Sequence, residues 1–259
     1  MGVNVKFLRS MSMAFTMYSW LPVPRVRWEK ENMAYAMCFF PLVGALVGAI
    51  LFFWLWLCAK LNIGFVLRAA GAVLIPIAVS GAIHMDGFCD TADALGSRQT
   101  RERKLEILKD SSAGAFAVIS CAAYLLIYFA LWCQIEPDPR AGLIFALMPV
   151  LSRSLSGLSV VTFKSARGDG LLASFSKAAQ TKTVRIVMIL WCLAVLITAV
   201  VLMPLPGAFA CAGALIAFIY YRIMSYRQFG GTTGDVAGYF LQISELMSLL
   251  FMLIALQWI

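Results

Sequence analysis

Charged residues are scarce in this sequence of 259 amino acids. Asp, Glu, Lys and Arg make up 13% of it and hydrophobic residues 62%, whereas soluble domains are about one quarter charged. This composition excludes an ordinary soluble domain and indicates an all-α integral membrane protein. Because a helix needs roughly 20 apolar residues to cross a bilayer, we expect a single domain, residues 1–259, with about seven spanning helices.

The seven cysteines lack any metal-binding or disulfide pattern. Their number is odd, no two form a Cys-x-x-Cys pair, and all but Cys89 lie inside apolar stretches. We interpret them as small apolar packing residues. A secretory signal is also missing, because no small-residue cleavage site follows the short apolar stretch 6–20. That stretch is predicted to be a helix lying in the membrane interface.

Seven longer apolar stretches are predicted to span the membrane. They cover residues 33–58, 64–83, 113–134, 141–161, 185–203, 207–222 and 236–257. Gly44 and Gly48 are spaced so that the first span can approach another helix closely. Pro204-Leu205-Pro206 leaves almost no loop between the fifth and sixth spans, which predicts a tight hairpin.

The basic residues predict the orientation in the membrane. The formal net charge is +8, and seventeen of the 21 Lys and Arg residues fall on alternate loops of the predicted topology. By the positive-inside rule the N-terminus and the loops 84–112, 162–184 and 223–235 face the cytoplasm. We therefore expect a multi-pass protein of the cytoplasmic (inner) membrane. The positive charge then marks topology and attracts anionic lipid, and we expect no nucleic-acid partner.

Polar residues are concentrated in residues 81–116, which hold six of the thirteen acidic residues and the only histidine, His84. Asp86, Asp90 and Asp93 are spaced i, i+4, i+7, so that a helix would project all three carboxylates from one face. A divalent cation such as Mg²⁺ would relieve their repulsion. The alternative is a solvated acidic helix start balanced by nearby arginines. His84 is a candidate general base, a metal ligand or an interfacial residue without a special role.

Two ionisable residues lie inside predicted spans. Arg153 in the fourth span and Glu245 in the seventh are each about eight residues from the cytoplasmic end, roughly 12 Å deep. Since buried charges are costly, we expect the two to pair or to share a substrate in a cytoplasm-facing cavity. Two flexible loops, 164–170 and 230–235, are further candidates for binding anions, the second because it leads into a helix N-terminus.

In their order along the chain, these segments resemble the cobalamin synthase family, also called adenosylcobinamide-GDP ribazoletransferases. The residues that carry the resemblance are His84-Met85-Asp86-Gly87-Phe88-Cys89-Asp90-Thr91-Ala92-Asp93-Ala94-Leu95, Glu106-Ile107-Leu108-Lys109-Asp110-Ser111, Arg167-Gly168-Asp169-Gly170-Leu171, Gly231-Thr232-Thr233-Gly234-Asp235 and Glu245. The resemblance implies a Mg²⁺-dependent transferase at the end of vitamin B12 synthesis. Such an enzyme joins adenosylcobinamide-GDP to α-ribazole, or to its 5′-phosphate, and releases GMP.

The resemblance also implies roles for individual residues. Asp86, Asp90 and Asp93 would bind the metal, and Asp93 or His84 would take the proton of the attacking hydroxyl. Substrate contacts are expected of Lys109, Asp110, Arg153, Arg167, Asp169, Thr233, Asp235 and Glu245. Membrane lipid is an expected partner, and a second copy of the chain or other enzymes of the pathway are further candidates.

Two other functions are compatible with parts of the sequence. CDP-alcohol phosphotransferases carry Asp-Gly-x₂-Ala-Arg, but here Asp86-Gly87 is followed by Asp90-Thr91. An ion-coupled transporter could use His84, Asp86 and Glu245 as coupling sites. Transporters often contain an internal repeat, and the sequence shows none.

Overall fold

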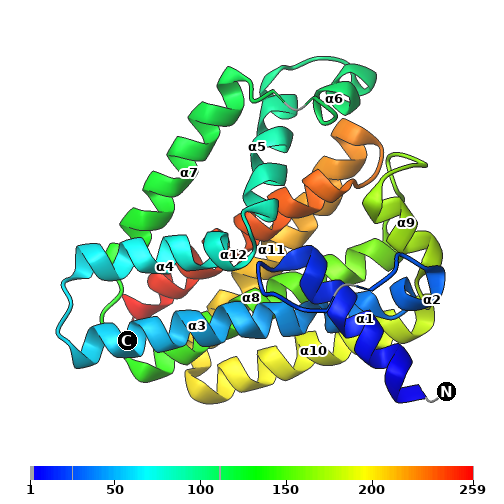
Figure 1. Cartoon of the computed structure of the whole chain (residues 1–259). Coiled ribbons are helices and arrows are strands. Elements are labelled where there is room, and N and C mark those ends of the chain that lie inside the picture. The colour runs from blue at the N-terminus through cyan, green and yellow to red at the C-terminus, as the bar shows by residue number, and fades with distance from the viewer. Residues whose placement is uncertain (1–2, 25, 111, 259) are drawn as a thin grey trace.

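The computed structural model describes residues 3–24, 26–110 and 112–258, with residues 3–6 and 171 described by their backbone alone. Ser111, one of the residues that carry the resemblance, therefore lies outside the described residues. Regular structure in the described part is helical (Figure 1): α1 (Val3–Tyr18), α2 (Lys30–Met33), the 3₁₀ turn η1 (Ala36–Phe39), α3 (Phe40–Lys60), α4 (Phe65–Val79), α5 (Ile83–Gly96), α6 (Arg101–Ile107), α7 (Ala115–Cys133), α8 (Pro139–Thr162), α9 (Leu171–Ala178), α10 (Thr181–Leu202), α11 (Pro204–Phe229) and α12 (Gly234–Leu256).

The predicted all-α polytopic bundle is confirmed. Within the described residues, six helical segments are long and apolar enough to cross a membrane, and the bent pair α4 and α5 makes a seventh if it counts as one span. Helix α1 is not among them, and it packs across α2, η1 and the start of α3 (Figure 1). The stretch 6–20 thus forms a helix that is not a candidate span, and its location in the membrane interface stays a prediction.

The second predicted span needs correction. Residues 64–83 were expected to form one helix followed by a loop, but α4 ends at Val79 and α5 continues at an angle of 94° to it. Gly81 and Ala82 both have φ of 62°, in the left-handed region, which interrupts the helical hydrogen bonds. The chain after the break is thus a helix that packs against α7 and α12, and the predicted loop 84–112 begins only after Gly96.

The expected hairpin between the fifth and sixth spans is present. Helix α10 ends at Leu202 and α11 begins at Pro204, where the first helical position needs no N–H donor. Helix α11 runs on to Phe229, beyond the predicted end at residue 222, and stops at Gly230 with φ of 74°. A left-handed glycine is a common helix terminator.

Helix α8 is the centre of the bundle and is buried along most of its length. It lies between α3 and α10 and also contacts α12 (Figure 1). Gly44 and Gly48 of α3 face it, as their spacing predicts: a Cβ atom at Gly48 would lie 1.9 Å from the Ala146 carbonyl oxygen. The backbones of α3 and α8 can therefore approach this closely only because α3 has no side chain there.

We predict that Gly48→Ala lowers the free energy of unfolding by about 1–3 kcal/mol, because the added methyl group must push α3 and α8 apart. Unfolding of detergent-solubilised protein followed by circular dichroism measures this. Gly64→Ala is the matched control, since a Cβ atom there would meet nothing within 4 Å. Equal stability of the two variants would contradict close α3–α8 packing.

Candidate active site

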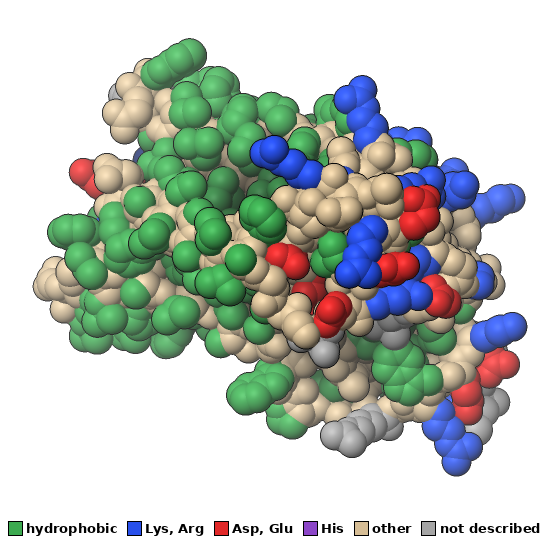
Figure 2. All heavy atoms as spheres, turned by 90° about the horizontal axis from the view of Figure 1, so that it is seen from above, with side chains coloured by type: hydrophobic (Ala, Val, Ile, Leu, Met, Phe, Trp, Pro, Cys, Tyr) green, Lys and Arg blue, Asp and Glu red, His purple; other side chains and the backbone are tan. Residues whose placement is uncertain are grey.

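A cavity of about 400 Å³ opens at one end of the bundle. Its lining comes from α1, η1, α3, α5, α8, α9 and α12, and from residues 108–109 and 165–170. Lys, Arg, Asp and Glu side chains gather over one side of the view from above, while hydrophobic side chains cover the other side (Figure 2). The polar residues that line the cavity are His84, Asp86, Lys109, Ser156, Ser165, Arg167, Asp169, Thr233 and Asp235.

Helices α5 and α12 meet at the cavity through glycines. A Cβ atom at Gly87 would lie 2.8 Å from the Asp235 carbonyl oxygen, and one at Gly238 would lie 3.1 Å from the His84 carbonyl oxygen. Side chains at these positions would separate the two helices. The glycines therefore allow Asp86 of α5 and Asp235 of α12 to line the same cavity.

The two loops predicted to bind anions are joined to each other. Ser165 and Thr232 form an isolated parallel bridge, in which the Thr232 N–H donates to the Lys164 carbonyl at 2.8 Å and the Ala166 N–H donates to the Thr232 carbonyl at 2.9 Å. The loop 164–170 is thereby fixed against the turn that leads into α12. Residues that are far apart in sequence, such as Arg167 and Asp235, become neighbours in the cavity lining.

Three helices begin at the cavity: Ile83 and His84 of α5, Leu172 of α9 and Gly234 of α12 all line it. The first N–H groups of a helix have no partner within the helix and carry partial positive charge, which favours anions. Thr233 caps α12, since its hydroxyl accepts a hydrogen bond from the Val236 N–H at 3.2 Å. The predicted role of Thr233 in a substrate site thus coincides with a structural role at the helix start.

Arg167 and Lys109 supply the positive side chains of the cavity. The Arg167 guanidinium donates to the Leu105 carbonyl, and its buried Nε has no hydrogen-bond partner among the described residues. Lys109 lies 3.6 Å from Asp169, with both side chains more than half exposed. Exposed pairs of this kind contribute little to stability, so both side chains can rearrange around an anion.

The three aspartates of α5 have different surroundings. Asp86 is exposed and lines the cavity, and Asp90 is partly buried one turn further on. Asp93 points to the start of α7, where its Oδ1 accepts a hydrogen bond from the Ala117 N–H at 3.2 Å. Within the described residues, no three His, Cys, Asp or Glu side chains are close enough together to hold a metal ion. Three carboxylates line the cavity: Asp86 and Asp235 come from different helices, and Asp169 comes from the loop 165–170.

Asp110 lies outside the cavity, in the exposed turn after α6. The Ser112 N–H donates to its carboxylate at 2.9 Å, and this bond lowers the pKa of Asp110 below its usual value. Its side chain therefore stabilises a turn next to Lys109 and does not itself line the cavity.

His84 is buried at the inner side of the cavity. Its ring stacks on Tyr18, with the ring centres 5.9 Å apart, and lies at the same distance from Phe40. Its Nε2 has no hydrogen-bond partner among the described residues. Of the two residues expected to take a proton, His84 and Asp93, only His84 lines the cavity.

A sequence profile of the cobalamin-5-phosphate synthase family matches residues 10–253. The chain belongs to this family. The adenosylcobinamide-GDP ribazoletransferase of Lachnoclostridium phytofermentans is 45% identical over 251 residues, which cover 97% of this chain and 95% of that protein. Proteins of the same name from Clostridium perfringens and Listeria monocytogenes are 33% and 28% identical, covering 94% and 93% of the chain and 97% and 96% of their own lengths. No solved structure matches the chain.

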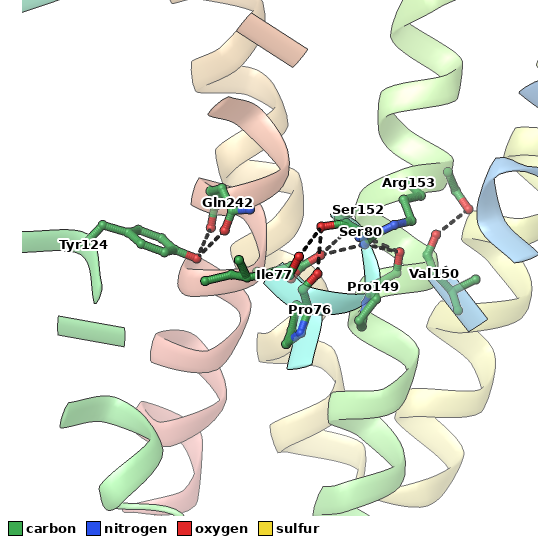
Figure 3. Close-up of polar contacts among 11 residues, drawn as sticks. Pro76, Ile77, Ser80, Tyr124, Pro149, Val150, Ser152, Arg153 and Gln242 are labelled. Carbon is green, nitrogen blue, oxygen red and sulfur yellow. Dashed lines mark hydrogen bonds and ion pairs between the residues drawn. The ribbon is translucent and has the colours of Figure 1, made fainter. Parts of the chain in front are cut away.

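Deeper in the bundle, this cobalamin-5-phosphate synthase family member buries an ion pair. The Arg153 guanidinium donates to the Pro149 carbonyl at 3.2 Å (Figure 3). It also donates to Glu245 Oε1 at 2.8 Å, and the Ser152 hydroxyl donates to the same Glu245 oxygen at 3.0 Å. The predicted pairing is thus confirmed. Neither Arg153 nor Glu245 lines the cavity, so the geometry gives them a supporting position between α8 and α12.

Sequence analysis missed the apolar part of this family member's site. Tyr18, Met37, Phe40 and Phe175 line the cavity. The first three occur in stretches that look like a membrane anchor or span, and Phe175 lies in the predicted loop 162–184. The spacing of these residues gives no sign that they meet, because they come from α1, η1, α3 and α9. The bend at Gly81 and Ala82 determines where α5 begins, and His84 at its start contacts Tyr18 and Phe40.

We predict that Glu245→Gln and Arg153→Met each lower the free energy of unfolding by about 3–5 kcal/mol, because each leaves one buried charge without its partner. The double variant Arg153→Met with Glu245→Leu should recover most of the loss. Denaturation in detergent micelles measures all three variants. Glu102→Gln, on the exposed surface of α6, is the control, and a double variant no more stable than either single one would contradict the pairing energy.

Proposed function

We propose that this chain is an adenosylcobinamide-GDP ribazoletransferase that transfers adenosylcobinamide phosphate to α-ribazole, or to its 5′-phosphate, and releases GMP. The observation that carries the proposal is the cavity, where the starts of three helices and the side chains of Arg167 and Lys109 face Asp86 and Asp235. Positive helix ends and cations suit a pyrophosphate. The names of the relatives supply the identity of the two substrates.

The pyrophosphate of adenosylcobinamide-GDP would lie against the start of α12 and beside Arg167. The buried Nε of Arg167 has no partner among the described residues, and an arginine fork can bind two phosphate oxygens at once. Lys109 can leave Asp169 at little cost, because that pair is exposed. These groups hold the phosphorus that is attacked and stabilise the charge that develops on the leaving GMP.

The ribazole hydroxyl attacks the phosphorus attached to cobinamide. Its oxygen forms the new P–O bond, the P–O bond to the bridging oxygen breaks, and GMP leaves with that oxygen. The hydroxyl proton passes to His84, which lines the cavity and whose buried Nε2 has no hydrogen-bond partner among the described residues. A side chain within reach of the transferred proton typically contributes 10²–10⁴-fold to the rate.

Mg²⁺ dependence is part of this proposal. Mg²⁺ is commonly held by one or two carboxylates together with substrate phosphates, and Asp86 and Asp235 line the phosphate-binding cavity from two helices. Without a cation, these carboxylates would repel an anionic substrate. A bound Mg²⁺ would be held by Asp86 and Asp235 and would neutralise charge on the pyrophosphate.

We further propose that the N-terminus and the cavity face the cytoplasm. Arg68, near the start of α4, donates to the Ile135 carbonyl between α7 and α8, whereas α5 begins at the cavity. The bent pair thus returns the chain from the far end of the bundle. Lys109 and Arg167 line the cavity, and the loops that hold them belong to the set that carries most of the Lys and Arg residues, as is typical of the cytoplasmic side.

For the topology, we expect seven crossings and a C-terminus on the outer side. Alkaline phosphatase fused after residue 259 should be active in cells, while green fluorescent protein fused at the same point should stay dark. The same reporters inserted after Arg98 are the control and should give the opposite result. A fluorescent C-terminal fusion would show that α4 and α5 do not complete a crossing.

For the reaction, we expect detergent-purified protein to release GMP only when adenosylcobinamide-GDP, α-ribazole and Mg²⁺ are all present. Asp86→Asn should slow release by on the order of 100-fold, because the charge that holds the cation at the phosphates is lost. Asp110→Asn removes the same charge from the exposed turn outside the cavity and should leave the rate within about twofold. Equal rates for the two variants would remove Asp86 from the site.

A further inference from the structure

One part of the cavity is built from apolar side chains. Met37, Phe40, Val160, Leu172, Phe175 and Leu241 line it, and they come from η1, α3, α8, α9 and α12. Met37 and Phe175 are each 1% exposed. The phosphate chemistry proposed above needs none of these side chains, so a different part of a substrate must explain them.

This apolar wall is rigid. The Phe40 ring packs on Tyr18 with the ring centres 4.3 Å apart, and Trp28 packs edge-on against Phe175 at 6.4 Å. Rings held by such neighbours lose little freedom when a ligand binds, which favours affinity. The wall is therefore suited to a flat, apolar group of fixed shape.

The two substrates differ in what they could place there. Guanine carries donors and acceptors along its edges, and each buried edge group left without a partner weakens binding. A corrin ring with its side chains is too large for a cavity of about 400 Å³. A dimethylbenzimidazole has no N–H donor once its nitrogen is joined to ribose, and its methyl groups gain from apolar contact.

We propose that the wall formed by Met37, Phe40, Val160, Leu172, Phe175 and Leu241 is the binding subsite for the benzimidazole base of α-ribazole. This inference rests on the proposed transferase function. Phe40, a member of the wall, packs on Tyr18, and both rings pack against His84. A base held on the wall therefore places its ribose hydroxyl toward His84 and the bound pyrophosphate. Contacts of the wall then select the acceptor and leave the donor unaffected.

The test measures KM for each substrate separately in Phe175→Leu, which removes an aromatic ring from the wall, and in Val160→Thr, which keeps its size but adds a hydroxyl. Both variants should raise KM for α-ribazole by about tenfold, as expected when a pocket loses apolar contact. KM for adenosylcobinamide-GDP should stay within about twofold. The preference for α-ribazole over the α-riboside of adenine should also narrow in Val160→Thr, because its hydroxyl can pair with a polar base.

Phe240→Leu and Val195→Thr are the matched controls, since both residues are as deeply buried but do not line the cavity. These two variants should not change KM for α-ribazole relative to KM for adenosylcobinamide-GDP. A rise in KM for adenosylcobinamide-GDP alone, or equal rises for both substrates, would overturn the subsite. Failure of the proposed function is distinguishable, because then the unmodified protein would release no GMP with either acceptor.

Discussion

The site depends on how closely α5 approaches the start of α12. The two backbones touch at Gly87 and Gly238, where any side chain would meet the carbonyl groups of Asp235 and His84. Lipid offers no hydrophobic force to press helices together, so close packing through small residues has to supply the association. The same contact places His84, Asp86 and Asp235 around one cavity. The contact at Gly87 and Gly238 therefore contributes both to the stability of the bundle and to the geometry of the site.

Charged residues deep in the bundle are paired, whereas several of those at the cavity are exposed to solvent. Arg153 and Glu245 lie deep in the bundle, where an unpaired charge is very costly, and they are paired with each other and hydrogen-bonded to α8. At the cavity, Asp86 is exposed and Lys109 is only loosely held by Asp169. Water can solvate these groups until a substrate replaces it. The bundle thus keeps charged side chains accessible to a substrate at the cavity. The charges buried deeper, Arg153 and Glu245, neutralise each other.

The sequence predicts those features that a local pattern determines. The depth of Arg153 and Glu245 within their spans predicted that they pair or share a substrate in a cavity, and the structure shows the pair outside the cavity. Gly44 and Gly48 predicted a close helix contact. The bend after α4 was missed, because hydropathy continues through Ser80, Gly81 and Ala82 and does not report a left-handed backbone. The apolar wall could not be predicted either. Its residues lie in predicted spans or in the predicted loop 162–184, on five different elements, and no local pattern shows that these elements meet.

The aspartates of α5 illustrate the limit of spacing as a guide to function. Positions i, i+4 and i+7 do share one face of a helix, but a helix of fourteen residues passes different neighbours along its length. Asp86 lies at the start of α5 beside α12 and the cavity, whereas Asp93, two turns later, meets the start of α7 and accepts the Ala117 N–H. Both positions are favourable for a carboxylate, since each lies near the positive end of a helix. The spacing therefore predicts which face of α5 the aspartates share. The role of each carboxylate depends on the neighbouring helix that it contacts.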